Sequence, residues 1–530
     1  MERVLDLADI QGNILQDFVG TFPSARFLLL HVNDAAKGRA FVLEYRPKIT
    51  TALRWDSSDA FVQEIQTTRP DVAINIGFTF WGLLALELPT RTLSRLPAEF
   101  IDGMKKRAAI LGDDLIARDD SFVDGIAQWN PVWLKPDQVH ILVGLNCGLD
   151  DYGKPLAALD RETGHLRDLC TKYDITILAG HDSNNAPWQD GCALLQEGQV
   201  QMAQNRATYK PVPREHFGFI DGISNPVFDG QFGNPYADQM MAIGNGKLLE
   251  EKSASADNSR WGPLATGEFL LGYPNEAQEI ADMAGPNEIM RNGTFLIFRK
   301  LHENVGSFNS YLAGAANIYA KAGTVSIADA GLILRAKMTG RWPDGVPVAV
   351  APTIAEWNDF DAKYKDKDLD WPYTDFTYAD DPHGSKCPVA SHMRRANTRD
   401  GLNGRNSALN NRRRILRRGL PYGLTTDDDN GEHGIIFLAL CADIGRQFEF
   451  VQQQWINYGL DANSGSDTCP VVGNRRGDSK FIVPVKPDGT ETPFIAAGIP
   501  QFVETRGGEY FFLPSMTALR MIGMGTTDPT

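Results

Sequence analysis

The order of apolar segments along the chain constrains its fold more than any other feature. Leucines at roughly helical spacing predict a helix over residues 155–173. Four other segments, rich in Val, Ile, Leu and Phe and bounded by Gly, Asp, Pro or Asn, are typical of buried β-strands. They are residues 27–32, 72–80, 139–145 and 175–179. The order β-α-β-(α)-β-α-β predicts a ferredoxin-like sheet backed by helices.

The second half of the chain repeats this pattern. Strands are expected at 268–272, 294–300 and 434–440, with a helix after the second of them. Another helix is expected to begin at Asp443, because apolar residues follow this capping residue at spacings of four, three and four. We therefore expect an α+β protein with two ferredoxin-like domains of antiparallel sheet, residues 1–205 and 206–530. No close sequence repeat accompanies the pattern.

Composition and charge exclude several classes of protein. Hydrophobic residues make up 42% and charged residues 22% of the 530 positions, which excludes a disordered chain. The formal net charge of −15 argues against general binding to nucleic acids or anionic membranes. No apolar run in the sequence approaches the roughly 18 residues that a membrane-spanning helix needs.

The cysteines and the amino terminus bear on cofactor attachment and location. Six cysteines are scattered without a CxxC pair, so a zinc ribbon, a thioredoxin-like site and covalent c-type haem are not expected. The first fifteen residues lack a basic stretch followed by an apolar core, which is the pattern of a signal peptide. We therefore expect a cytoplasmic location, although export with a partner protein would leave no trace in this sequence.

A long stretch from residue 342 to residue 423 differs from the rest of the chain. It has few periodic apolar runs, and nine arginines lie between Arg394 and Arg418. A loop of this length is usually functional or disordered, and we interpret it as a segment that wraps around the protein and builds a site. The arginines could bind phosphate, nucleic acid or the carboxylates of a cofactor, or could form a solvated basic surface.

Two residues stand out as candidates for chemistry. His392 lies at the start of the arginine cluster, whose charge favours a neutral imidazole able to bind a metal, although most single histidines are surface or hydrogen-bonded residues. Asp221 lies between Ile220 and Gly222, where burial would raise its pKa toward the range useful for proton transfer. The glycines Gly218 and Gly222 would let the backbone approach a flat ligand closely. The alternative for Asp221 is an Asp-Gly turn between two strands.

Several longer motifs extend over nearly the whole chain. They are DIQGNIL (9–15), HFGFIDGISNP (216–226), GEFLLGYPNE (267–276), NGTFLIFRKL (292–301), HMRRAN (392–397), ILRRGLPYG (415–423) and GGEYFFLPS (507–515). In this order they resemble the dye-decolorizing peroxidases, and the length resembles the larger subgroup with fungal and some bacterial members. The sequence lacks the GxSxG, P-loop, HExxH, EF-hand and dinucleotide-binding motifs that would support other enzyme classes.

The resemblance implies two ferredoxin-like domains and one haem b per chain, held mainly by the second domain. By position in the motifs, His392 is similar to the proximal iron ligand, Asp221 to the distal acid–base residue and Arg417 to the distal arginine. These residue types suit peroxide chemistry, in which a base moves a proton between the oxygens and a cation stabilises the charge that develops as the O–O bond breaks. A distal carboxylate also predicts an acidic pH optimum.

Further residues complete the expected haem site. A proximal imidazole usually donates its second N–H to a carboxylate, and Asp467 is the first candidate for that partner, with Glu449 the second. Arg394, Arg395 and Arg399 are expected to hold the haem propionates, with a position on the surface as the alternative.

The function expected from the resemblance is the hydrogen-peroxide-dependent oxidation of anthraquinone-type dyes, phenolics and other small aromatic reductants. The alternative is a non-catalytic haem-binding or iron-delivery protein on the same fold, because fold and ligand do not establish turnover. The presence of both Asp221 and Arg417 favours the enzyme. Nucleic-acid binding through the arginines is a weaker alternative, and both a monomer and a homo-oligomer are left open.

Bulky dyes are not expected to reach a buried haem edge. Their electrons would then enter through a tyrosine or tryptophan at the surface, although such residues are more often simply packed. The candidates are Trp261, Trp371, Tyr373 and Tyr422.

Overall fold

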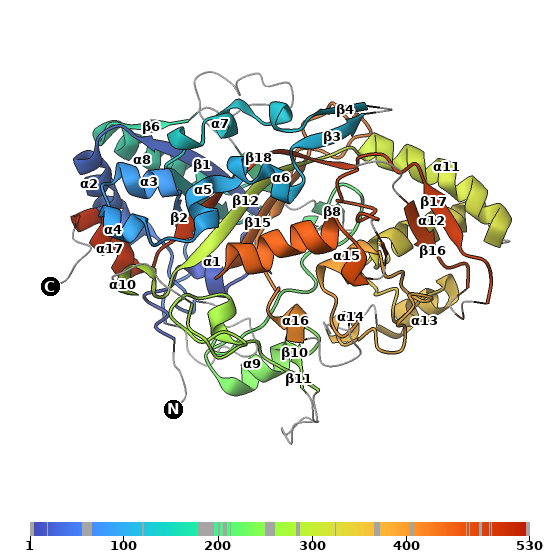
Figure 1. Cartoon of the computed structure of the whole chain (residues 1–530). Helices are drawn as coiled ribbons and strands as arrows, with labels where there is room; N and C mark the ends of the chain where they lie inside the picture. Colours follow the sequence, from blue (N-terminus) through green and yellow to red (C-terminus); the bar gives the residue numbers. More distant parts are fainter. Residues whose placement is uncertain are drawn as a thin grey trace.

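A computed structural model gives the fold of most of the chain (Figure 1). No helix in this described part is both long and apolar enough to cross a membrane. The described residues are 5–18, 20–55, 66–118, 121–178, 196–199, 202–204, 209–211, 214–249, 260–281, 287–323, 325–364, 371–402, 408–462, 464–465, 467–475, 480–486, 488 and 490–525.

The first half forms a ferredoxin-like sheet, as its apolar segments predict. Its strands are β1 (Ser24–Val32), β2 (Val72–Phe78), β5 (Ile141–Cys147) and β6 (Ile175–Ile177), and they lie in the order β2-β5-β1-β6. The helices that follow the first and third of these strands are α2 (Ala35–Tyr45) and α8 (Ala158–Lys172), and α8 packs on β5 and β6. This is the β-α-β-β-α-β arrangement with antiparallel neighbours.

The second half has the same strand order. Its long strands are β12 (Thr294–Glu303), β15 (Gly434–Cys441) and β18 (Val503–Leu513), and the short strands β13 (Leu416–Arg417) and β14 (Leu420–Tyr422) pair with β15. In both halves, the first strand along the chain (β1 or β12) lies between the third (β5 or β15) and the last (β6 or β18), and the second (β2 or β13) lies beyond the third. The duplication predicted from the pattern is therefore present in the topology.

The two half-sheets join through β2 and β18, where Phe78 pairs with Phe512. The joined sheet curls, because Phe27 of β1 packs edge to face against Phe298 of β12 with ring centroids 5.9 Å apart. Residues of both halves thus share one continuous core on the concave side of the sheet. The observed α+β, antiparallel and barrel-like architecture confirms the predicted fold class. The predicted domain boundary near residue 205 lies outside the described residues and stays a prediction.

Helices cover the outer side of the sheet and one end of the molecule. Figure 1 places α11 (Val305–Gly323) and α12 (Ile327–Thr339) side by side, at the end opposite α2 and α17 (Met516–Met524). The helix predicted to begin at Asp443 is wound in the wide π form, as η5 (Ile444–Glu449) and η6 (Val451–Ile456). Its cap is confirmed, since the Asp443 carboxylate accepts a 2.8 Å hydrogen bond from the backbone N–H of Arg446.

In its described part, the long stretch from residue 342 to residue 423 contains four short helices and, near its end, the short strands β13 and β14, which add to the sheet beside β15. The helices are α13 (Ile354–Tyr364), α14 (Trp371–Thr374), α15 (His392–Ala396) and α16 (Ala408–Asn411). The strand predicted at 268–272 is wrong, because this segment is a turn after the 3-10 helix η4 (Thr266–Glu268). The segment is apolar in sequence, but its backbone forms turns and not a strand. It is held in part by Glu268, which is fully buried and whose carboxylate binds Arg446.

Shorter elements fill the connections. They are α1 (Gly12–Leu15), α3 (Phe80–Ala85), α4 (Thr90–Leu93), α5 (Ala98–Lys106), α6 (Ala108–Leu111), α7 (Pro131–Leu134), α9 (Pro235–Met241), α10 (Asn287–Met290), β3 (Leu115–Arg118), β4 (Ser121–Asp124), β7 (Gln196–Gln199), β8 (Met202–Gln204), β9 (Tyr209–Pro211), β10 (Lys247–Leu248), β11 (Trp261–Gly262), β16 (Lys480–Val483), β17 (Phe494–Ala497), η1 (Arg46–Lys48), η2 (Ile126–Gln128), η3 (Pro136–Gln138) and η7 (Leu460–Ala462).

A buried ion pair ties the two halves together beside the sheet. Arg299 of β12 donates from Nη2 to both carboxylate oxygens of Asp113, at 2.5 and 2.7 Å, and to the hydroxyl of Thr505 on β18 at 2.5 Å. Both charged side chains are less than a tenth exposed. Burial raises the pKa of Asp113 in spite of the arginine, so its ionised form depends on this partner.

We expect Arg299→Met to lower the free energy of unfolding by about 3–5 kcal/mol at neutral pH, because it leaves a buried carboxylate without its cation. The double variant Arg299→Met with Asp113→Leu should recover much of that loss, since it removes both charges. Urea unfolding of the two variants and the wild type measures the difference. Equal stability of the single variant and the wild type would contradict the role given to the pair.

Candidate active site

A cavity of about 300 Å³ lies in the second half, between the outer face of the sheet and the helices α15, η5 and η6. Successive side chains of a β-strand point to opposite faces of the sheet, so β12 contributes side chains both to the cavity and to the core. Arg299, Leu301 and Glu303 line the cavity, whereas Leu296 and Phe298 belong to the shared core. The apolar part of the wall includes Phe448, Val451, Ile456, Val471 and Val472.

The predicted iron ligand, His392, is the first residue of α15 and lines this cavity. Its ring nitrogen Nδ1 lies 3.4 Å from the sulfur of Cys469. Burial opposes protonation of His392, but Cys469 outweighs burial and raises the pKa of the imidazole. Burial would likewise raise the pKa of the Cys469 thiol, but His392 and then Arg395 outweigh it and lower that pKa to about 6.

Neither predicted carboxylate partner contacts His392 in the described structure. Asp467 accepts a 2.7 Å hydrogen bond from Arg395 through its backbone carbonyl. Glu449 forms a two-pronged ion pair with Arg107, at 2.5 and 2.6 Å, and accepts a hydrogen bond from Tyr510. The geometry therefore does not support a carboxylate at Nδ1, and Cys469 occupies that position instead.

Asp221 and Arg417 come together on the same cavity, although 196 positions separate them. Arg417 donates from Nη1 to Oδ1 of Asp221, and the backbone N–H of Gly222 donates to the same oxygen at 2.7 Å. Arg417 is placed by β13 and by Asn225, whose side-chain oxygen accepts the Arg417 backbone N–H at 3.1 Å.

The pKa of Asp221 is lowered and not raised, contrary to the expectation from burial. Burial does oppose ionisation, but the charge of Arg417 and the hydrogen bonds from Gly222 and Arg417 outweigh it. The sequence pattern showed the apolar neighbours of Asp221 and could not show that an arginine from a distant strand reaches its carboxylate.

The two glycines flanking Asp221 are required by the backbone. Gly218 has φ of 93° and Gly222 has φ of 82°, both in the left-handed region that other residues rarely adopt. A Cβ atom on Gly222 would meet nothing within 4 Å, so conformation and not space explains this glycine. Neither glycine is part of the cavity wall around His392, and their close approach to a flat ligand stays a prediction.

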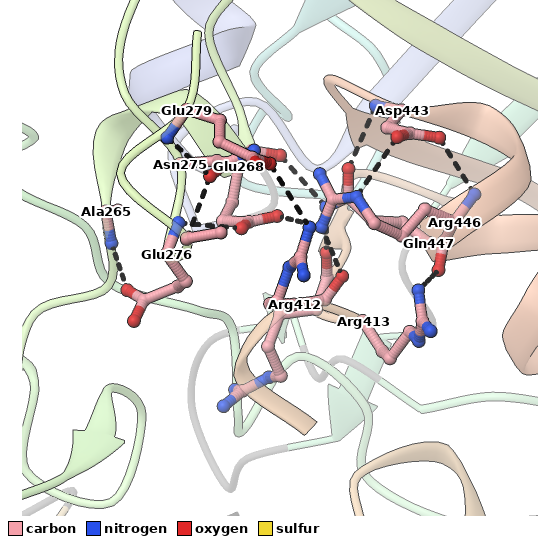
Figure 2. A network of polar contacts seen from close by, with 12 residues as sticks. Ala265, Glu268, Asn275, Glu276, Glu279, Arg412, Arg413, Asp443, Arg446 and Gln447 are labelled. Carbon is pink, nitrogen blue, oxygen red and sulfur yellow. Dashed lines mark hydrogen bonds and ion pairs between the residues drawn. The ribbon is translucent and has the colours of Figure 1, made fainter. Parts of the chain in front are cut away.

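A network of polar contacts fixes the segment that leads into β13 (Figure 2). Arg446 donates from Nη1 to the Glu268 carboxylate at 2.6 Å and to the carbonyl of Arg412 at 2.7 Å. Gln447 donates to the carbonyls of Glu268 and Arg414 at 2.9 and 2.6 Å. The π-wound helix thereby holds the backbone just before Arg417.

The arginines predicted to bind propionates are buried but are not part of the cavity wall. Arg394 pairs with Asp381 at 2.9 Å, and Arg395 bonds to backbone carbonyls. Arg399 donates to the carbonyl of Phe376 at 2.8 Å and stacks over its ring. These arginines hold the long 342–423 stretch together, and the geometry does not support the propionate assignment.

Two other buried arginines, Arg341 and Arg414, do line the cavity. Arg341 donates to the carbonyls of Gly345 and Tyr373, and its Nε atom is buried without a hydrogen-bond partner. Within the described residues, neither Arg341 nor Arg414 forms a salt bridge, and burial lowers the pKa of each to about 9. Such uncompensated buried cations suit the carboxylates of a bound ligand.

Two carboxyl groups at the cavity were not identified from the sequence. Glu215 accepts 2.7 Å hydrogen bonds from the backbone N–H groups of Phe217 and Phe219, and Glu303 accepts one from His216. Burial raises the pKa of Glu215 to about 7 and that of Glu303 well above its ordinary value. Glu215 lies only six positions before Asp221, and this spacing was the available signal.

A second cavity of about 630 Å³ lies on the other side of the segment that carries Asp221. Gly222, Ile223 and Asn225 form part of its wall, and aromatic residues form another part. Of the four predicted electron-entry residues, Trp371 lies in this wall and is 46% exposed, and Tyr373 lies beside it. Trp261 and Tyr422 are buried.

Comparison with known proteins places the chain in a family. Its residues 9–148 match the family model described as DyP dimeric alpha+beta barrel domain, and residues 361–484 match Dyp-type peroxidase, C-terminal. The dye-decolorizing peroxidase msp1 of Mycetinis scorodonius is 30% identical over 98% of this chain and 88% of that protein. Peroxidase 2 of the same fungus is 28% identical over 97% of this chain and 87% of its own length.

Solved structures support the fold. The fungal DyP-type peroxidase from Auricularia auricula-judae has a TM-score of 0.70 at 23% identity and covers 98% of this chain and 100% of its own. A dye-decolorizing peroxidase in complex with 2,6-dimethoxyphenol has a TM-score of 0.69 at 24% identity, with the same coverage. Together with the matching family models, the curated relatives and the site geometry, these findings show that the chain belongs to the dye-decolorizing peroxidases, a family of haem peroxidases.

Proposed function

We propose that this chain binds one haem b in the cavity of about 300 Å³ and uses hydrogen peroxide to oxidise anthraquinone-type dyes, phenolics and other small aromatic compounds. The observation that carries the proposal is the presence of His392 and the Asp221–Arg417 pair on one cavity. A related structure holds 2,6-dimethoxyphenol, which supports the class of reductant.

The residues of the cavity fit haem. His392 would bind the iron, and the apolar wall around Phe448 and Val451 would contact the porphyrin. Arg341 and Arg414 are the residues we assign to the propionates, because they are buried cations that pair with no carboxylate among the described residues. Haem, when bound, supplies the iron that takes up peroxide and stores its oxidising equivalents.

Asp221 and Arg417 have separate roles in the reaction with peroxide. The Asp221 carboxylate accepts the proton from one peroxide oxygen and gives it to the other, which leaves as water. Arg417 stabilises the negative charge that develops on the leaving oxygen. The same arginine keeps Asp221 ionised, because it holds the pKa of that carboxyl below its ordinary value. The base therefore stays competent in acid, which supports the expected acidic optimum.

The second candidate function is a haem-binding or iron-delivery protein without turnover. Such a protein needs the iron ligand and the cavity but has no use for a base held ionised by an arginine. The Asp221–Arg417 ion pair on the cavity therefore favours the enzyme. A cytoplasmic location stays a prediction of the sequence.

For large reductants, we propose that Trp371 is the point of electron entry. It is the exposed member of the four candidates, and its neighbour Tyr373 accepts a 2.8 Å hydrogen bond through its carbonyl from Arg341, which lines the haem cavity. The second cavity, which Trp371 lines, is bordered by the segment that carries Asp221.

His392→Ala should abolish stoichiometric haem uptake, because it removes the iron ligand. Titration of the haem-free protein with haem, followed by the Soret absorbance, measures this. The exposed His383 provides a control, since His383→Ala should bind haem as the wild type does. An unchanged Soret band in His392→Ala would contradict the ligand assignment.

Asp221→Asn should slow the reaction of the haem-loaded protein with peroxide by about 10²–10⁴-fold while haem uptake is unchanged, because the amide cannot accept the proton. In the wild type, the rate should be retained in acid and lost only as the pH falls through the lowered pKa of Asp221. Stopped-flow spectra across pH measure both effects, with the exposed Asp151→Asn as control. A full rate in Asp221→Asn would favour the haem carrier.

Trp371→Phe should lower the turnover of a bulky anthraquinone dye several-fold and leave the reaction with peroxide unchanged, because phenylalanine cannot relay the electron as readily. Steady-state dye oxidation and stopped-flow peroxide kinetics separate the two steps. Trp81, which is 39% exposed on α3 in the first half, offers a matched control as Trp81→Phe. Equal dye turnover in the two variants would remove Trp371 from the electron path.

A further inference from the structure

The sulfur of Cys469 is the group nearest to the ring nitrogen Nδ1 of His392 among the contacts of the described residues, at 3.4 Å. Cys469 is fully buried, in the loop that follows the 3-10 helix η7. Its backbone is held from three sides: its N–H donates to Ile456 at 2.7 Å, and its carbonyl accepts from Gly473 at 3.1 Å and from Arg475 at 2.7 Å. The sulfur is thus placed firmly against the imidazole.

The direction of this hydrogen bond follows from the role of His392. An imidazole that binds iron through Nε2 must carry its proton on Nδ1. If the thiol donated to Nδ1, the proton would stay on Nε2 and block iron binding. The sulfur must therefore act as the acceptor, with His392 as the donor.

Two buried arginines lie near Cys469. Arg395 lies on the same helix as His392, and Arg475 bonds to the carbonyl of Cys469 itself. Both guanidiniums are buried, and Nη2 of Arg475 has no hydrogen-bond partner. Of the two carboxylates that were candidate acceptors, Glu449 pairs with Arg107, and Asp467 is half-buried and accepts its hydrogen bond from Arg395 through its backbone carbonyl.

We propose that Cys469 is the positioning residue that accepts the Nδ1–H hydrogen bond of His392 and thereby sets the tautomer and the electron donation of the iron ligand. The proposal rests on His392 binding the iron, as proposed above. A sulfur acceptor takes the place that a carboxylate usually has next to a metal-binding histidine. It should make the imidazole a better donor to iron than an unbonded ring is, and so stabilise the ferric state.

The test compares Cys469→Ala, Cys469→Ser and Cys469→Asp in the haem-loaded protein. The first removes the acceptor, the second replaces the sulfur with a neutral oxygen acceptor, and the third places a carboxylate there. We expect the ferric–ferrous reduction potential to rise in Cys469→Ala, to stay close to the wild-type value in Cys469→Ser, and to lie at or below the wild-type value in Cys469→Asp. The iron–imidazole stretching frequency of the ferrous protein, from resonance Raman spectra, should fall in Cys469→Ala.

A matched control separates the hydrogen bond from the loss of a buried thiol. Cys170 is equally buried on α8 in the first half, and Cys170→Ala should change neither the potential nor the stretching frequency. If Cys469→Asp does not fold, because it buries a charge, the difference between Cys469→Ser and Cys469→Ala still decides the question.

The outcomes distinguish this proposal from the proposed function. If the wild type binds haem through His392 but Cys469→Ala has the wild-type potential and stretching frequency, the role of Cys469 is overturned and the haem site stands. If the wild type does not take up haem, the proposed function falls and the role of Cys469 falls with it.

Discussion

Strand β12 is the structural element on which the cavity proposed to bind haem and the core both depend. It is hydrogen-bonded to β15 on one side and to β18 on the other for nearly its whole length, so its pleat and register are fixed from both edges. Phe298, from one alternate set of side chains, lies in the core that the two halves share, and Arg299 and Glu303, from the other set, line the cavity. A slip of one residue would exchange the two sets, so the cavity is as firmly placed as the core.

Most of the sheet could be predicted from apolar segments, because strands such as β1, β5 and β15 are buried and bounded by turn residues. Strand β18 was not predicted, since Gly507 and Gly508 interrupt its pattern; a Cβ on Gly507 would meet the ring of Trp133, at 2.1 Å from Cδ1, and only glycine fits. The segment at 268–272 was assigned to a strand because its local composition is apolar, although its bonds go to the distant Arg446.

The site could be predicted only where a short motif carries the functional residue itself. His392 and Asp221 lie within such motifs, and their placement on one cavity agrees with the roles inferred for them. Side chains whose role comes from contacts across the fold were not predictable: Cys469 meets His392 across 77 positions, and Arg341 is placed at the cavity by the end of α12. The arginines of the cluster that were predicted to bind propionates do not line the cavity, because neighbouring groups in the fold already accept their hydrogen bonds.

The two buried arginines at the cavity, Arg341 and Arg414, also affect how the chain becomes a stable protein. Two desolvated cations that find no carboxylate in the described part of the chain destabilise the fold before any ligand arrives. A ligand that brings carboxylates to them stabilises the folded state by mass action, in proportion to the logarithm of its concentration over its dissociation constant. Because these cations and His392, the proposed iron ligand, line the same cavity, we expect haem binding to raise the stability of the folded chain as well as to complete the site.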